Sequence, residues 1–384
     1  MKEKRILGGR KEVRVATAQA APVFMDKEKT IEKVSGLMAE AAKGGAQLVV
    51  FPETFIPTYP AWYTGGWESP PREWAPYMVA LQDNAVVVGS RDTEALGEAA
   101  RAANIYAAIG INELDDRTGS RTVYNTLLFM GPDGKVLGRH RKLMPTYTER
   151  TYWGWGDASD LFVLDTDIGR IGGLICGENM MILLKAAMMH QGEEFHIAVW
   201  PGAWSAHGKT SLMDPETDTL GGTCPIYPVI RSYALESQCF VLSCGGILRK
   251  EDIPEKWDYL HQSHHLNYAA AVGGSAIVNP MGRYMAGPSL GEETILYADC
   301  HANQLKLAKV IFDCLGHYTR WDAVQLKVRT EPWTPDGSER RAHPPEVPRE
   351  DLKRISQKWE IEVDQLEGIL EDLSRSPAGG KLPT

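Results

Sequence analysis

Apolar strand-like runs alternate with amphipathic helical patterns along the first 330 residues, and this rhythm constrains the fold most. Residues 13–19 read as a strand, residues 27–43 as an alanine-rich amphipathic helix and residues 47–53 as the next strand. Further helices are predicted at 71–82, 180–190 and 227–237, and further strands at 106–113, 123–130, 196–200 and 240–244, with a last hairpin from 275. This order predicts an α/β fold in which helices cover sheets.

Composition narrows the class of protein. The 384 residues are 43% hydrophobic and 24% charged, enough to bury one large α/β core or two smaller ones. A formal net charge of -9 argues against a nucleic-acid partner, because phosphate binding needs a clustered positive face. Residues 1–5 lack the apolar region of a signal peptide and no apolar run has the length of a spanning helix, so we expect no membrane partner.

The cysteines favour a reduced, cytoplasmic setting over a disulfide framework. They are irregularly spaced and contain no CxxC pair. The six positions are Cys176, Cys224, Cys239, Cys244, Cys300 and Cys314.

One of these cysteines stands at the end of the apolar run 172–175, directly before a short polar segment that opens a helix. A strand that ends in a glycine-containing turn exposes the side chain at its tip, and the dipole of a helix starting there favours thiolate over thiol. Cys176 is therefore a candidate nucleophile; the alternative is a buried structural cysteine beside a turn. Glu178, two residues later, is expected to stabilise the N-terminus of the following helix rather than to do chemistry.

A carboxylate closes another apolar run, residues 48–53. Burial at the end of such a strand disfavours the ionised form, which raises the pKa of the acid toward the range of a general base. Glu53 is a candidate for that role; the alternatives are a helix N-cap or an acid in a surface turn.

A basic run, residues 139–142, leads directly into proline, tyrosine and two tryptophans within residues 145–155. A solvated basic hairpin is the usual reading of such a run. The aromatic residues that follow must be packed somewhere, however, which favours a position near a core for Lys142.

Taken together and in this order, Glu53, Lys142 and Cys176 resemble the Glu-Lys-Cys set of the nitrilase superfamily of carbon-nitrogen hydrolases. Residues 51–53 with 59–62 are similar to the nitrilase form of the first motif, and residues 316–322 resemble a signature of true nitrilases. The resemblance runs from about residue 13 to about residue 328. It implies a four-layer α-β-β-α sandwich, which periodicity alone does not distinguish from a doubly wound sheet.

The resemblance also implies a reaction: Cys176 attacks a nitrile carbon, Glu53 acts as general base and Lys142 stabilises the charge that develops on nitrogen. The product is a carboxylic acid with ammonia, reached through a thioimidate and a thioester. Glu149 resembles the second glutamate of the family, which positions Lys142 and substrate; its alternative is an exposed loop acid. No cofactor is implied.

Gly177 departs from the family pattern, since true nitrilases commonly have tryptophan after the nucleophile. This change bears on substrate range and admits some amide product. An amidase or a cyanide-degrading relative would use the same three residues, and a non-catalytic oligomeric scaffold is a further alternative.

Candidate substrate-binding residues are aromatic side chains near the motifs, together with the glycine after the nucleophile. They are Tyr59, Trp62, Gly177, Trp200 and Trp204, and each aromatic residue is equally plausible as plain core. The cluster His261, His264 and His265 is the rival metal signal, but its polar neighbours read as an exposed loop, so we predict no metal site.

The C-terminal region differs from the rest, which gives a hydrolase domain over residues 1–330 and a tail over 331–384. Residues 331–350 are rich in proline and charge and read as an extended arm. Residues 352–373 repeat apolar side chains at three- and four-residue steps, the pattern of an amphipathic helix. Such a helix must pack on its own subunit or on another. Relatives form dimers that stack into spirals or filaments, so we predict a homo-oligomer to which the tail contributes.

Overall fold

The computed structural model describes residues 5–60, 71–202, 225–257, 271–310 and 312–332. The chain divides into two compact units, Met1–Glu331 and Pro332–Thr384. Most of the predicted arm and all of the predicted terminal helix lie outside the described residues, so the interpretation of the tail stays a prediction.

One of the two sheets in the first unit has six strands. They are β1 (Glu12–Gln19), β2 (Leu48–Val50), β3 (Tyr106–Leu114), β4 (Val123–Met130), β5 (Val136–Arg141) and β13 (Thr294–His301). Their order across the sheet is β13-β1-β2-β3-β4-β5. The central pairs β1·β2 and β2·β3 are parallel, and the outer pairs are antiparallel.

The second sheet has seven strands. They are β6 (Leu164–Thr166), β7 (Gly169–Ile175), β8 (Phe195–Trp200), β9 (Phe240–Gly245), β10 (Ile247–Leu248), β11 (Ala271–Val278) and β12 (Tyr284–Leu290). The order is β10-β11-β9-β8-β7-β6, and β12 pairs with β11. As in the first sheet, the central strands β7, β8 and β9 run parallel.

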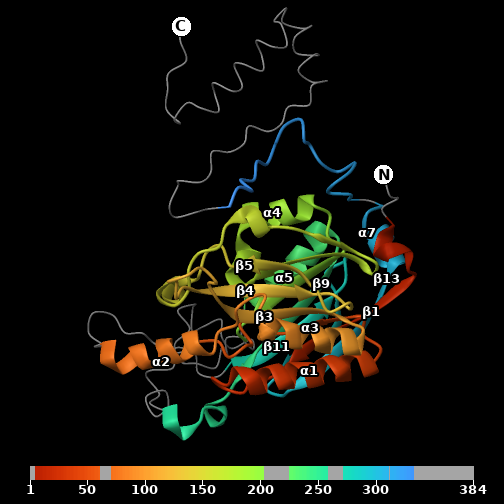
Figure 1. The fold of residues 1–384 in the computed structure, drawn as a ribbon. Helices are drawn as coiled ribbons and strands as arrows, with labels where there is room; N and C mark the ends of the chain where they lie inside the picture. Colours follow the sequence, from red (N-terminus) through yellow and green to blue (C-terminus); the bar gives the residue numbers. More distant parts are fainter. Residues whose placement is uncertain (1–4, 61–70, 203–224, 258–270, 311, 333–384) are drawn as a thin grey trace, which may run out of the picture. The chain divides into compact units, whose positions relative to one another are not determined.

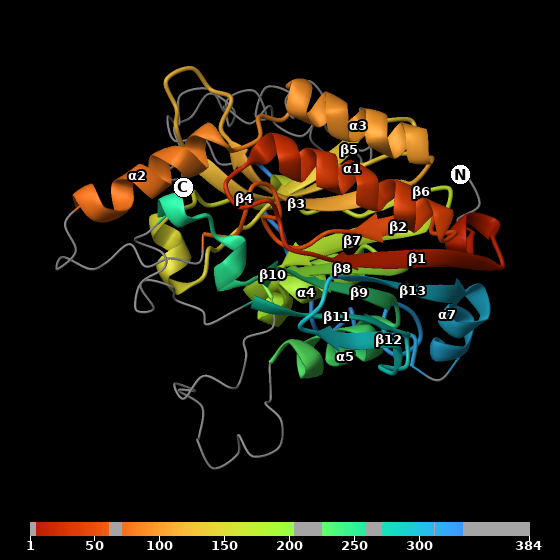
Figure 2. The ribbon, with the colours of Figure 1, turned by 90° about the horizontal axis from the view of Figure 1, so that it is seen from below.

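Helices cover the outer face of each sheet. The α-helices are α1 (Lys27–Lys43), α2 (Pro71–Asp83), α3 (Arg91–Ala103), α4 (Ile182–His190), α5 (Ile226–Ser237) and α7 (Ala302–Ala308). Short 3-10 helices are η1 (Ile6–Gly9), η2 (Tyr147–Thr151), η3 (Ala158–Asp160), η4 (Cys176–Met180), η6 (Lys250–Asp252) and η7 (Glu255–Trp257). Figures 1 and 2 show α1 and α3 on the six-stranded sheet and α4 and α5 on the seven-stranded sheet. The four-layer α-β-β-α sandwich is confirmed.

Strand alternation sorts the side chains of the six-stranded sheet between two cores. In β4, Leu127 and Phe129 are buried in the cluster that joins the two sheets, whereas Leu128 and Met130 are buried in the cluster that includes α1 and α3. This period of two is the geometry of a strand with both faces covered. Each fully buried aliphatic side chain contributes about 1.5–3 kcal/mol, so both faces of the sheet stabilise the fold.

Most predicted elements are found, β5, β6, β10, β13 and α7 are additional to them, and three further differences stand out. The strand predicted over 47–53 ends at Val50, so Glu53 stands beyond the sheet rather than in it. The helix predicted from 180 is divided into η4 and α4. Helix α3 was not predicted, although Ser90 caps its N-terminus and Asn104 ends it in a left-handed conformation. In the part of the chain that the structure describes, no helix combines the length and apolarity needed to cross a membrane.

Candidate active site

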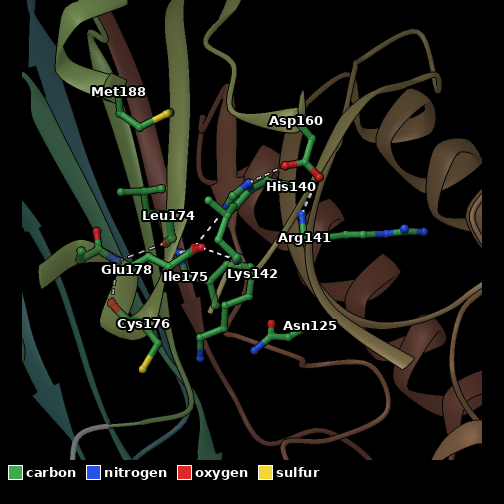
Figure 3. A network of polar contacts seen from close by, with 12 residues as sticks. Asn125, His140, Arg141, Lys142, Asp160, Leu174, Ile175, Cys176, Glu178 and Met188 are labelled. Atoms are coloured by element: carbon green, nitrogen blue, oxygen red, sulfur yellow. Dashed lines mark hydrogen bonds and ion pairs between the residues drawn. The ribbon is translucent and has the colours of Figure 1, made fainter. Parts of the chain in front are cut away.

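The candidate catalytic residues come from both sheets. Glu53 follows β2 and Lys142 follows β5, both in the six-stranded sheet, whereas Cys176 follows β7 of the other sheet. Glu149 lies in η2. The structure brings all four together, and each is at most 3% exposed. Figure 3 shows the Lys142 and Cys176 side chains extending toward the same region.

Lys142 is bonded to both glutamates. Its Nζ donates to Glu53 Oε1 at 2.8 Å and to Glu149 Oε2 at 2.7 Å. Glu149 also accepts from Tyr59 Oη at 2.7 Å and from the Thr146 backbone N–H at 2.6 Å. Glu149 is thus a buried partner of the lysine, which the alternative of an exposed loop acid does not fit.

Burial and the neighbouring charges together raise the pKa values of Glu53, Cys176 and Lys142. Burial raises the pKa of Glu53 to about 7, although the Lys142 charge opposes the shift. Burial and the Glu53 charge raise the pKa of Cys176 well above its usual value. Burial lowers the pKa of Lys142, but the charges of Glu53, Cys176 and Glu149 outweigh burial and leave it well above its usual value. Near neutral pH the site therefore holds a thiol, an ammonium and a carboxylate able to exchange a proton.

Glu53 has one occupied and one free oxygen. Asn125 Nδ2 donates to Glu53 Oε1 at 2.6 Å, on the same oxygen that binds Lys142. The buried Oε2 has no hydrogen-bond partner among the described residues. Since Oε1 is held by two donors, Oε2 is the oxygen available to accept a proton. Sequence reasoning missed Asn125, whose signal was a polar residue within the apolar run 123–130.

The nucleophile stands on a strained turn. Cys176 has φ 51°, in the left-handed region that a residue with a Cβ seldom adopts. Asn179 Nδ2 donates to Cys176 O at 3.0 Å, and Asn179 Oδ1 contacts His196 Nε2 at 2.8 Å. These buried contacts hold the turn in place, and the turn lifts the cysteine out of the strand direction.

The basic run is not a solvated hairpin. Arg139 and Arg141 both bond to the buried carboxylate of Glu113, at 2.5 Å and 2.6 Å. Lys142 Nζ lies 5.7 Å from the centroid of the Trp153 ring, a cation–π distance. Trp153 therefore packs beside the site, as the sequence suggested, whereas Tyr147 and Trp155 are exposed and do not pack as expected.

The predicted substrate-binding residues have different surroundings. The Tyr59 ring lies edge-on to Trp153 at 5.6 Å, and its hydroxyl binds Glu149. Trp200 is fully buried and its indole N–H donates to Ser243 Oγ at 3.0 Å, which fits the core alternative. A Cβ on Gly177 would have Thr146 Oγ1, at 3.2 Å, as its one near atom among the described residues. Trp62 and Trp204 lie outside those residues.

Metal binding has little support from the geometry. One ligand atom each from Glu53, Glu149 and Cys176 lie within 4.8 Å of one another. The Lys142 ammonium, bonded to both carboxylates, already supplies a positive charge between them. The histidines at 261, 264 and 265 lie outside the described residues.

Known proteins are similar to this chain in sequence and in fold. The carbon-nitrogen hydrolase family model matches residues 14–310. An aliphatic nitrilase of Sinorhizobium fredii (strain HH103) is 39% identical over 325 residues, which cover 83% of this chain and 96% of the relative. A bifunctional nitrilase/nitrile hydratase of Lupinus angustifolius is 36% identical over 333 residues, 84% of this chain and 88% of the relative.

A solved carbon-nitrogen hydrolase from Helicobacter pylori G27 has the same fold, with a TM-score of 0.62 at 17% identity over 81% of this chain and 96% of that chain. The family match spans most of the described unit and includes the strand ends that carry Glu53, Lys142 and Cys176. The chain therefore belongs to the carbon-nitrogen hydrolase family and, within it, to the nitrilase branch.

Proposed function

We propose that this protein is a nitrilase, which hydrolyses an organic nitrile to a carboxylic acid and ammonia. The observation that carries the proposal is the buried arrangement of Glu53, Lys142 and Cys176, in which one glutamate oxygen has no partner among the described residues. The nitrilase relatives support the choice of substrate class.

In the first half of the reaction Glu53 Oε2 accepts the thiol proton as Cys176 Sγ attacks the nitrile carbon. A C–S bond forms, and one electron pair of the C≡N bond moves to nitrogen. The Lys142 ammonium stabilises this developing charge because it is already in position and needs no reorganisation. A proton then reaches the nitrogen, which gives a neutral thioimidate.

In the second half Glu53 accepts a proton from water as the water oxygen adds to the thioimidate carbon. The tetrahedral intermediate expels ammonia and becomes a thioester. A second water then releases the carboxylic acid and returns the Cys176 thiol. We assign to Glu149 the role of holding Lys142 in place, through the 2.7 Å contact between them.

An assay of ammonia release tests this function. The panel consists of aliphatic, aromatic and arylacetonitriles, with the matching amides and cyanide as competing substrates. We expect turnover of at least one nitrile class and none by Cys176→Ala, whereas Cys314→Ala, which changes a partly exposed cysteine elsewhere, keeps wild-type activity. Turnover of amides or cyanide alone would favour the alternative enzymes, and no turnover of any substrate would favour the scaffold.

The same tetrahedral intermediate can instead expel the thiolate, which gives an amide. We propose detectable amide beside the acid, because Gly177 places no side chain next to the nucleophile. A change of about 1.4 kcal/mol between the two barriers changes the product ratio tenfold. The Lupinus angustifolius relative, named as both nitrilase and nitrile hydratase, supports a mixed outcome.

Gly177→Trp should lower the amide fraction and the activity on bulky nitriles. The Cβ of the new side chain would have one near neighbour among the described residues, the Thr146 hydroxyl, which can rotate away. Product chromatography on one small and one bulky nitrile measures both effects. An unchanged acid-to-amide ratio together with an unchanged preference between the small and the bulky nitrile would show that position 177 does not face the reacting carbon.

We also propose a homo-oligomer, in which dimers stack into spirals or filaments with the help of residues 331–384. The setting we propose is cytoplasmic, in keeping with the five unpaired cysteines of the described part. Deletion of 331–384 should lower the particle mass in light scattering more than it lowers the melting temperature. An unchanged mass with a collapsed melting temperature would show instead that the tail packs on its own subunit.

A further inference from the structure

Glu178 binds the backbone on both sides of the candidate site. Its Oε1 accepts from the Leu143 N–H at 2.7 Å, and its Oε2 accepts from the Ile175 N–H at 2.9 Å. Leu143 is the residue directly after Lys142, and Ile175 is the residue directly before Cys176. Figure 3 shows Glu178 beside Ile175 and near the backbone of Lys142.

These two backbone groups lie at the ends of strands from different sheets. The Leu143 N–H follows β5 of the six-stranded sheet, and the Ile175 N–H ends β7 of the seven-stranded sheet. In the described part of the chain no strand of one sheet pairs with a strand of the other. One carboxylate therefore links the end of the strand that carries the lysine to the end of the strand that carries the nucleophile.

A buried histidine keeps this carboxylate charged. His140 Nε2 contacts Glu178 Oε2 at 2.9 Å, and His140 Nδ1 contacts Asp160 Oδ1 at 3.0 Å. Burial lowers the pKa of His140, but the charges of Glu178 and Asp160 outweigh it and raise the pKa to about 10. Burial raises the pKa of Glu178, but the His140 charge and the hydrogen bonds outweigh it and leave the pKa lowered.

The negative charge of Glu178 matters because each of its two oxygens must accept a hydrogen bond from a backbone N–H. An ionised carboxylate only accepts hydrogen bonds, so both oxygens can serve a backbone N–H. A neutral amide in the same place has one acceptor and one donor, and its NH₂ would face one of the two N–H groups. That backbone group would then be buried without a partner.

On the basis of the proposed function, we propose that Glu178 is a positioning residue that sets the separation of Lys142 and Cys176, and that His140 keeps both of its oxygens available. Neither residue needs to touch the substrate. This role goes beyond the helix-stabilising one expected from the sequence, since the Leu143 contact reaches across the site.

The test compares Glu178→Gln with Glu113→Gln in the full-length protein. Glu113 is a matched control: it is equally buried and bonds to Arg139 and Arg141, the neighbours of His140 and Lys142 on the same chain segment. We expect Glu178→Gln to lower kcat for a nitrile by about 100-fold with KM changed less than about threefold, since a shift of about 1 Å between reacting groups has this effect. Glu113→Gln should change kcat by less than about threefold.

A second measurement does not depend on nitrile turnover. The rate at which iodoacetamide alkylates Cys176 is followed by peptide mass spectrometry, which separates Cys176 from the other cysteines. In Glu178→Gln we expect this rate to fall about tenfold, because Cys176 moves away from the Glu53 base. A variant that is only loosened would expose Cys176 and alkylate it faster.

Glu178→Asp is a second variant that tests the proposal if Glu178→Gln does not fold. It keeps the charge facing His140, but its side chain is one methylene too short to reach both N–H groups. We expect kcat at least about tenfold below wild type. Wild-type kinetics in this variant, faster alkylation in Glu178→Gln, or equal losses in Glu178→Gln and Glu113→Gln would each overturn the proposal. Absence of nitrile turnover in wild type, with slowed alkylation in Glu178→Gln, would reject the proposed function and leave the positioning role standing.

Discussion

Two buried glutamates, Glu53 and Glu113, bind basic residues from one short segment of chain, on opposite faces of the six-stranded sheet. Arg139 and Arg141 point to the face covered by helices and bond to Glu113, which also accepts from Thr126 Oγ1. Lys142 lies on the face toward the second sheet and bonds to Glu53. Both oxygens of Glu113 accept hydrogen bonds, whereas Glu53 Oε2 has no donor in the part of the chain that the structure describes.

The difference separates a structural carboxylate from a reactive one. Glu113 has two guanidinium partners and a hydroxyl partner, and these donors occupy both of its oxygens. Glu53 shares a single ammonium with a second carboxylate, Glu149, and its free oxygen is desolvated. Burial raises the pKa of Glu53 to about 7, because the attraction of the shared Lys142 charge does not fully offset the desolvation.

Replacing each glutamate by glutamine should give opposite results, and this is the largest expected effect. Glu53→Gln should lower kcat/KM by about 10⁴-fold, because the general base is lost. Its melting temperature should hold, since glutamine resembles the protonated form that burial favours.

Glu113→Gln should lose about 1–3 kcal/mol of stability, because two half-buried guanidinium groups lose their charged partner. It should keep most of its kcat/KM below its melting temperature. Steady-state kinetics and thermal denaturation on the same samples check both variants; an active Glu53→Gln would remove the distinction between the two carboxylates.

The second largest effect is expected in the dependence of kcat/KM on pH for the wild-type enzyme. Only ionised Glu53 can accept the thiol proton, and its pKa is raised to about 7, so activity is lost as pH falls through 7. We expect kcat/KM at pH 5 to be about 100-fold below its plateau. Melting temperatures over the same range show whether the protein stays folded, and an acid limb near pH 4.5 would mean that Glu53 is not desolvated.

Two neighbouring residues of β4 give the finest test. Asn125 donates to Glu53, and Thr126, on the other face, donates to Glu113. The Asn125 bond lowers the pKa of Glu53, so Asn125→Leu should move the acid limb to higher pH by about one unit, about tenfold in rate at pH 6. Thr126→Val should leave the limb in place, and equal shifts in both variants would point to a general loosening of β4.

The sequence indicated where several strands end, but not which side chains lie opposite those ends. Period-two and helical patterns predicted β1 and α1 almost to the residue, and glutamate and cysteine at the ends of apolar runs indicated where chemistry would lie. The four candidate residues do meet, while their catalytic roles stay predictions. The family resemblance, rather than periodicity, supplied the four layers.

The contacts around these residues could not be predicted from local pattern. Asn125 acts through its place opposite Lys142, whose backbone N–H donates to Asn125 O at 2.8 Å, and this pairing depends on the register of two strands. The sequence places His140 in a basic run of a kind that is usually solvated. Its burial could not be predicted, because the carboxylates that contact it, Asp160 and Glu178, come from η3 and η4. Such positions depend on tertiary packing, which no local periodicity records.

Because the general base and the nucleophile come from separate sheets, enzyme activity can appear during folding only after both sheets have formed and packed together. A chain with only the six-stranded sheet formed holds Glu53 and Lys142 without a thiol, and a chain with only the other sheet holds a cysteine without a base. Contacts between residues so distant in sequence form late, because loop closure precedes them. The return of enzyme activity in a refolding experiment should therefore time the docking of the two sheets, and partly folded intermediates should be catalytically silent.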